Sequence, residues 1–117
     1  MTPSIKKHLN VFKSTYHNLI NSQDDFTIRK IILDLCIYLE NSFLLDKAYL
    51  KKYPIFLTCE ANKVCIKDQS IDDLLTFLTI IYRIDYVDSN SDAFLMYYKN
   101  GMILSILDEI IHKMELL

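Results

Sequence analysis

The stretch SIDDLLTFLTIIYRIDYV, residues 70–87, places apolar side chains around most of the circumference of a helix. A surface helix carries a single apolar stripe, whereas a helix that is apolar nearly all round is typical of a buried, central element. Ser70 and Asp73 precede the apolar run with the spacing of a capping box, which predicts the helix start. The rest of the chain is therefore expected to pack around this helix.

Two amphipathic helices are predicted before it. The first begins near Thr2 and Pro3, because proline suits the first helical position, and it ends at the polar run 21–25. The second follows Asp24 and Asp25, whose carboxylates suit the positive end of a helix. The predicted apolar stripes are Ile5, Leu9, Phe12, Tyr16, Leu19 and Ile20 in the first helix, and Ile28, Ile31, Ile32, Leu35, Cys36, Leu39 and Phe43 in the second.

A last helical stretch is predicted from about Asp92, with Gly101 marking a kink or a break between two helices, because glycine costs roughly 1 kcal/mol in a helix interior. Its apolar stripe could complete the core or pair with a second copy of the chain, so a homodimer is one option. The stripe consists of Ile103, Ile106, Leu107, Ile110, Ile111 and Met114.

Residues 46–68 carry a mixed signal. Pro54 biases Tyr53 away from helical angles, and residues 55–59 and 64–66 are rich in β-branched and aromatic side chains. This pattern favours a small β-hairpin around residues 55–67 that lies on the helices, with a helix across the region as the alternative. The expected fold is mainly α: a single domain over residues 1–117, built as a bundle of four to five helices with this one β element.

Charge is unevenly distributed along the chain. Residues 1–53 hold eight Lys/Arg and five Asp/Glu, whereas residues 54–117 hold five and ten, giving +3 and −5. An acidic C-terminal half argues against nucleic-acid binding, which needs clustered positive charge. No run approaches 18 apolar residues, so no membrane span is expected. The N-terminal sequence does not resemble a secretory leader, which predicts a cytoplasmic protein.

Catalytic equipment is sparse. One glycine in 117 residues argues against a glycine-rich phosphate loop. His8, His17 and His112 are far apart and fall near helix surfaces. Cys59 and Cys65 would face each other across the predicted hairpin, which is compatible with a disulfide under oxidation. Zinc sites usually combine two close ligand pairs, and the chain has no second pair. We therefore expect no enzyme activity, no metal and no cofactor.

The acidic residues of the C-terminal half are the candidate binding residues. Six aspartates lie between positions 68 and 92, opposed by Arg83 alone. Such a surface would steer a basic partner protein toward the chain, and tyrosine is favoured where binding energy concentrates. The predicted partner-binding residues are Asp68, Asp72, Asp73, Asp85, Tyr86, Asp88 and Asp92.

Residues 81–86, 93–94 and 100–107 carry an Arg after an apolar helix, an acidic and aromatic turn, and a short helix that reaches a Gly and an Ile/Leu-rich end. This pattern resembles the C-terminal part of small bacterial immunity proteins, including those of contact-dependent growth-inhibition systems. The resemblance implies a cytosolic, non-enzymatic inhibitor that binds and blocks a cognate toxin domain, often a nuclease.

A second interpretation follows from the central apolar helix and from a composition rich in Ile, Lys, Asn and Tyr, which is typical of an AT-rich gene. A small viral protein of the Bcl-2-like kind would bind a host amphipathic helix in an apolar groove. An exposed apolar patch of a few hundred Å² would favour this interpretation, whereas a polar, acidic concave face would favour the immunity protein.

Overall fold

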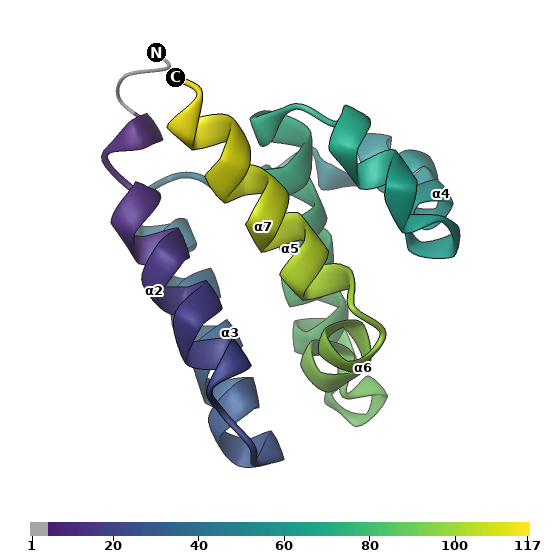
Figure 1. The fold of residues 1–117 in the computed structure, drawn as a ribbon. Helices are drawn as coiled ribbons and strands as arrows, with labels where there is room; N and C mark the ends of the chain where they lie inside the picture. Colours follow the sequence, from purple (N-terminus) through teal and green to yellow (C-terminus); the bar gives the residue numbers. More distant parts are fainter. Residues whose placement is uncertain (1–4) are drawn as a thin grey trace.

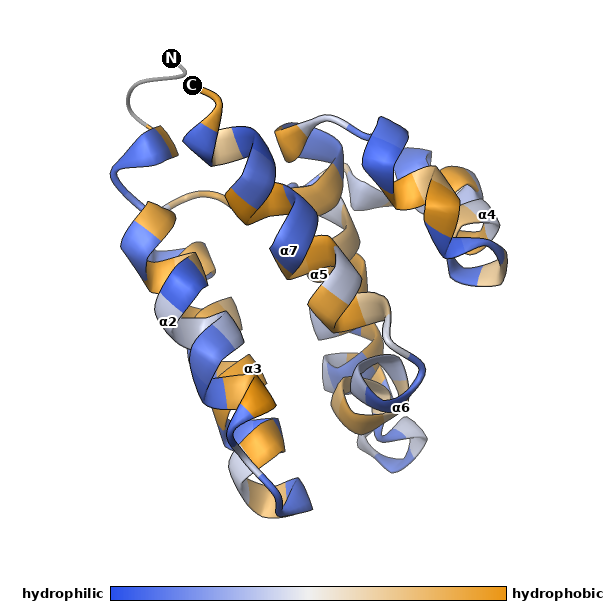
Figure 2. Cartoon of the chain, in the orientation of Figure 1, coloured by the Kyte–Doolittle hydropathy of each residue, from blue (hydrophilic) through white to orange (hydrophobic). Residues whose placement is uncertain are grey.

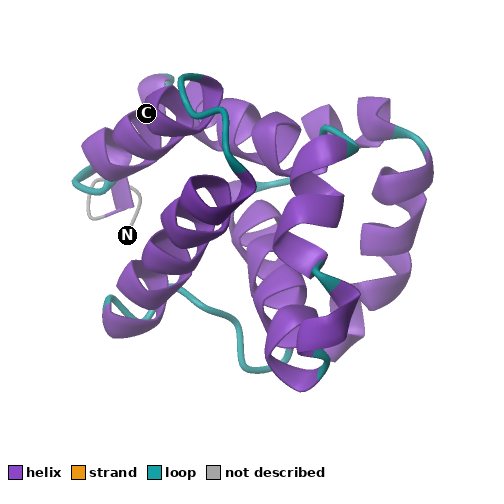
Figure 3. Cartoon of the chain, turned by 90° about the horizontal axis from the view of Figure 1, so that it is seen from below, coloured by secondary structure: helices purple, strands orange, loops and turns teal. Residues whose placement is uncertain are grey.

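The computed structural model describes residues 5–117, all of whose secondary structure is helical (Figure 3). The predicted helix start at Thr2 and Pro3 lies outside the described residues. The elements are α2 (Leu9–Ile20), α3 (Asp25–Asn41), the 3₁₀ helix η1 (Tyr49–Lys52), α4 (Tyr53–Ala61), η2 (Lys63–Asp68), α5 (Ile71–Val87), η3 (Ser89–Ser91), α6 (Ala93–Lys99) and α7 (Met102–Glu115).

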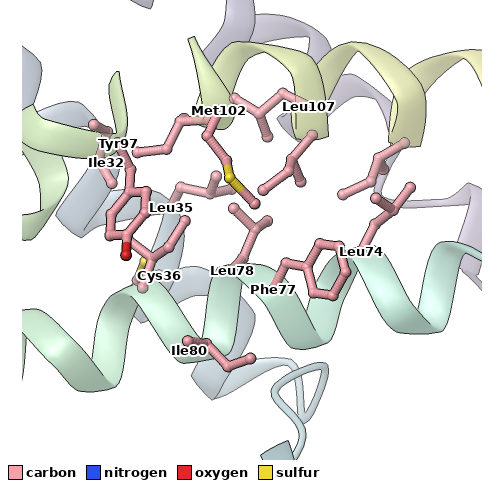
Figure 4. Close-up of a cluster of buried hydrophobic side chains, with 14 of the residues drawn as sticks. Ile32, Leu35, Cys36, Leu74, Phe77, Leu78, Ile80, Tyr97, Met102 and Leu107 are labelled. Atoms are coloured by element: carbon pink, nitrogen blue, oxygen red, sulfur yellow. The ribbon is translucent and has the colours of Figure 1, made fainter. Parts of the chain in front are cut away.

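Helix α5 is central, as its sequence predicts. Its eight consecutive residues from Leu74 to Ile81 are all buried. In Figure 1, α2 and α3 lie on one side of it, α7 crosses in front and α4 lies on the other side. Figure 4 shows Phe77 and Leu78 pointing toward α7 while Ile80 points the opposite way. A helix buried on several sides needs apolar residues nearly all round. Residues 74–81 supply them except at Thr76 and Thr79, whose hydroxyls donate to the carbonyls of Asp72 and Leu75.

The other helices turn one apolar face toward this core (Figure 2). The stripe of α7 is buried within the chain's own core except for Ile111, which is partly buried, and Cys36 of α3 is also buried, as predicted. Ile5, the first described residue, and Leu117 line one surface groove. The largest fully buried side chains are Phe12, Phe56, Phe77, Leu19, Leu39, Ile66, Leu74, Ile80, Ile81, Met102, Ile103 and Ile106.

The predicted β-hairpin at residues 55–67 is wrong, because this segment forms α4 and η2. Tyr53 adopts helical angles (φ −58°, ψ −41°) in spite of the proline that follows it. Pro54 lies in the first turn of α4, where its missing N–H would have no helical partner. Phe56 is buried against Phe77, with ring centroids 5.5 Å apart. Packing on the core therefore outweighs the β propensity of a short apolar run.

The C-terminal third divides at Gly101 as predicted. Gly101 has φ +88° and separates α6 from α7. The break at Gly101 gives two helices, α6 and α7, and α4 forms where the hairpin was expected. The described residues therefore contain six α-helices, α2 to α7, more than the expected four to five.

Phe43 was predicted to end the apolar stripe of α3, and this is wrong. Helix α3 ends at Asn41, and Phe43 has φ +59° with its side chain 92% exposed. The Phe43 N–H donates to the carbonyl of Glu40 (3.1 Å) and the Leu44 N–H donates to that of Leu39 (2.9 Å). These two bonds define a Schellman motif, in which the left-handed position is usually glycine.

Candidate partner-binding surface

The six candidate aspartates fall into two groups at opposite ends of α5. Asp68, Asp72 and Asp73 lie at its start, and the other three lie at or just beyond its last turn. At 1.5 Å per residue, Asp73 and Asp85 are separated by about 18 Å along the helix axis. The structure therefore does not bring the six carboxylates together on one small surface.

The first group serves the start of the helix. The Asp73 N–H donates to Ser70 Oγ (3.1 Å), which confirms Ser70 as the N-cap. The Asp73 carboxylate forms an ion pair with Lys52 Nζ at 2.6 Å and so does not close a reciprocal capping box. Asp72 stands in the first turn, where a negative charge interacts favourably with the helix dipole.

The second group forms a protruding corner with two exposed apolar side chains. We define the acidic corner as Asp85, Tyr86, Val87, Asp88 and Asp92. Tyr86 is 75% and Val87 is 81% exposed. Asp88 follows the last helical residue, and its carboxylate accepts the Asn90 N–H (3.1 Å), which holds the turn η3. The corner thus combines carboxylates with apolar contact area.

Asp92 is the neutralised member of this corner. It has left-handed backbone angles (φ +53°), and Arg29 Nε and Nη2 of α3 each donate to one of its carboxylate oxygens at 2.9 Å. These hydrogen bonds from the guanidinium lower the pKa of Asp92. This two-bond geometry ties α3 to the start of α6.

Asp85 is in the opposite electrostatic situation. Its carboxyl is half-buried, and burial, with the nearby charge of Asp92 as a second cause, raises its pKa. A hydrogen bond from the Phe94 N–H and the charge of Arg29 oppose this shift without cancelling it. The ionised Asp85 is therefore held in an environment that disfavours its charge.

An apolar groove adjoins the acidic corner, and the sequence alone did not indicate it. The groove has a volume of about 310 Å³ and lies between η1 and the second half of α5. Leu50, at its edge, is 70% exposed. Its walls come from residues 49–53 and from the second half of α5, and the sequence alone does not show that these two segments pack together. Its lining residues are Tyr49, Leu50, Tyr53, Ile80, Arg83, Ile84, Val87 and Asp88.

Several tyrosines and histidines have structural roles. Tyr97 is buried, and burial raises its pKa to about 12. The Tyr82 hydroxyl donates to Glu40 at 3.3 Å. His8 was expected near a helix surface but is buried, with Nδ1 2.6 Å from the hydroxyl of Tyr38. Tyr86 differs from these residues because its ring is largely in solvent.

Within residues 5–117, no three His, Cys, Asp or Glu side chains gather in a way that could hold a metal ion. The same residues contain no helix of the length and apolarity needed to cross a bilayer. Comparison with known proteins gives no match: no family model, no curated protein and no solved structure is significantly similar to this chain.

Proposed function

We propose that this chain is a non-enzymatic inhibitor of the immunity-protein kind, which binds a cognate toxin domain in the cytoplasm through the acidic corner. The observation that carries the proposal is the exposure of Tyr86 and Val87 between the carboxylates of Asp85 and Asp88. Tyrosine is enriched in binding hot spots, and interfaces surround an apolar centre with a polar rim.

Charge complementarity defines the partner as a basic protein surface. Asp85 and Asp88 form no ion pair within residues 5–117, whereas Asp73 and Asp92 do. A Lys or Arg of a partner would offset the unfavourable environment of the Asp85 carboxylate. A nuclease domain suits this requirement, because its substrate cleft attracts phosphates with positive charge.

The test is binding to the product of the gene immediately upstream in the source genome, measured by co-purification and by titration calorimetry. Tyr86→Ala and Asp88→Lys should each weaken the complex at least tenfold, and raised salt should slow association. Asp68→Lys and Asp72→Lys are matched controls, because they reverse exposed carboxylates at the far end of α5. Asp92→Lys is avoided because it would also break the Arg29 ion pair.

Equal loss of affinity in both sets of variants would contradict the acidic corner as the site and would indicate a general charge effect. Unchanged affinity in Tyr86→Ala and Asp88→Lys would also exclude it. Cleavage of nucleic acid by the partner, restored when Asp88→Lys replaces the wild-type chain, would support the inhibitory role.

A second function is favoured by the apolar groove beside η1. An amphipathic helix could insert apolar residues against Tyr53, Ile84 and Val87. Binding of a labelled amphipathic helical peptide, abolished by Leu50→Asp and retained by Tyr86→Ala, would support this groove-binding function. The opposite pattern of losses would support the acidic corner.

A further inference from the structure

Two of the three cysteines lie side by side. Cys59 is in the last turn of α4 and Cys65 is in η2, and their Sγ atoms are 2.6 Å apart. The sequence placed them opposite each other in a hairpin, whereas the structure brings them together through the tight turn between α4 and η2. Neither residue is required by the proposed partner-binding surface.

Local hydrogen bonds hold this turn in place. Asn62 caps η2, with its side-chain oxygen accepting the Val64 N–H (3.2 Å) and its carbonyl accepting the Cys65 N–H (3.0 Å). The Gln69 side-chain amide, which is buried, donates to the carbonyl of Cys65 at 3.1 Å. These bonds fix the backbone around Cys65 beside the last turn of α4, which carries Cys59.

The two thiols differ in access to solvent. Cys59 is fully buried, and burial, with its thiol neighbour as a second cause, raises its pKa to about 12. Cys65 is only half-buried. Cys36 is buried elsewhere in the core, where burial strongly raises its pKa. Because oxidants react with accessible thiolates, Cys65 is the residue that a small oxidant would reach.

We propose that Cys59 and Cys65 form a reversible intramolecular disulfide when the chain meets a peroxide. The Cys65 thiolate attacks the peroxide O–O bond, giving a sulfenic acid and one water after proton transfer. The Cys59 sulfur then attacks the Cys65 sulfur, the S–O bond breaks and a second water leaves. Two thiols lose two electrons and two protons to hydrogen peroxide, and two equivalents of a small thiol such as glutathione reverse the step.

The bond would join the end of α4 to the segment that leads into the Ser70 cap of α5. The modification is independent of the partner proposal, because it requires only the chain and an oxidant. If no disulfide formed, the proposal for the acidic corner would stand. If the acidic corner did not bind a partner, the proposal for the cysteine pair would stand.

The test exposes the reduced chain to stoichiometric hydrogen peroxide, then counts free thiols in denaturant and maps the peptides by mass spectrometry. Wild type and Cys36→Ser should each lose two thiols and the mass of two hydrogens, with the cross-link between Cys59 and Cys65, and dithiothreitol should restore both. Cys59→Ala should instead accumulate sulfenic acid on Cys65, trapped by dimedone.

Three results would overturn the proposal: retention of all three thiols, a cross-link that includes Cys36, or the same sulfenic acid yield in wild type and Cys59→Ala. Peptide mapping of the wild-type chain gives a decision even if Cys59→Ala does not fold, because it requires no variant.

Discussion

Replacing Phe43 with glycine should stabilise the fold, although it removes a large apolar side chain. Phe43 occupies the left-handed position of the Schellman motif that ends α3, with φ +59°. A Cβ in that conformation costs roughly 1–2 kcal/mol, because it approaches the following carbonyl oxygen. Glycine avoids this contact.

The size of the effect follows from two opposing terms. Glycine adds freedom to the unfolded chain, which costs roughly 0.4–1 kcal/mol. The phenyl ring is 92% exposed, so its removal forfeits little buried apolar area. The net gain in free energy of unfolding is therefore about 0.5–1 kcal/mol, or a rise in Tm of roughly 2–4 °C for a domain of this size.

The measurement is urea unfolding followed by far-ultraviolet circular dichroism. Phe43→Ala is the matched control, because it removes the ring but keeps the Cβ. We expect Phe43→Ala to lie close to wild type and Phe43→Gly to unfold at higher urea. If both variants were equally stabilised, exposure of the ring would be the cause; if Phe43→Gly were no more stable than wild type, the strain argument would be refuted.

Four further predictions concern local structure. Gly101→Ala should lose about 0.5–1 kcal/mol in urea unfolding, because the strain of a Cβ in the left-handed backbone at Gly101 exceeds the gain from a less flexible unfolded chain. Ser70→Ala should lower the free energy of unfolding by about 1 kcal/mol in the same assay. Ser70→Asp should stay close to wild type, because aspartate also caps a helix. Arg29→Ala should be less stable than wild type at neutral pH; because the ion pair lowers the pKa of Asp92, this difference should vanish as pH falls through that lowered pKa. Asp85→Asn should be more stable than wild type at neutral pH and equal to it well below the carboxyl's usual pKa of 3.8, since a raised pKa means that ionisation destabilises the fold.

The long, strongly patterned elements could be predicted from the sequence. Helix α5 was identified because apolar side chains cover most of its circumference, and the structure buries every residue from 74 to 81. The break at Gly101 was expected because glycine is costly inside a helix. In both cases a local signal and the tertiary packing agree, and such agreement makes a sequence interpretable.

The errors arose where tertiary contacts decide between similar local energies. Residues 55–67 hold short apolar runs that suit a strand or a buried helix, and the contact of Phe56 with Phe77 favours the helix. Phe43 matches the helical rhythm of α3, but the helix ends two residues earlier. The local sequence shows neither the contact of Phe56 with the Phe77 ring nor the end of α3 at Asn41.

The candidate site shows the same limit. The aspartates are neighbours in sequence, but a straight helix separates them into two groups. Lys52 and Arg29, which neutralise Asp73 and Asp92, lie 21 and 63 residues away in the chain. Sequence reasoning could count these charges but could not pair them, so it could not tell a neutralised carboxylate from one left for a partner.

That distinction supports the acidic corner as the functional surface. The fold neutralises Asp73 and Asp92 with ion pairs, yet it leaves Asp85 in an environment that raises its pKa. It also leaves the Tyr86 ring in solvent within the same turn of α5. The Asp85 carboxylate accepts the Phe94 N–H at the start of α6, but burial still disfavours its charge, and the exposed Tyr86 ring buries little apolar area. Residues that function requires are often the ones that stability alone would replace. Asp85→Asn should therefore raise the stability of the chain while lowering its affinity for a basic partner, a combination that a purely structural role for Asp85 does not predict.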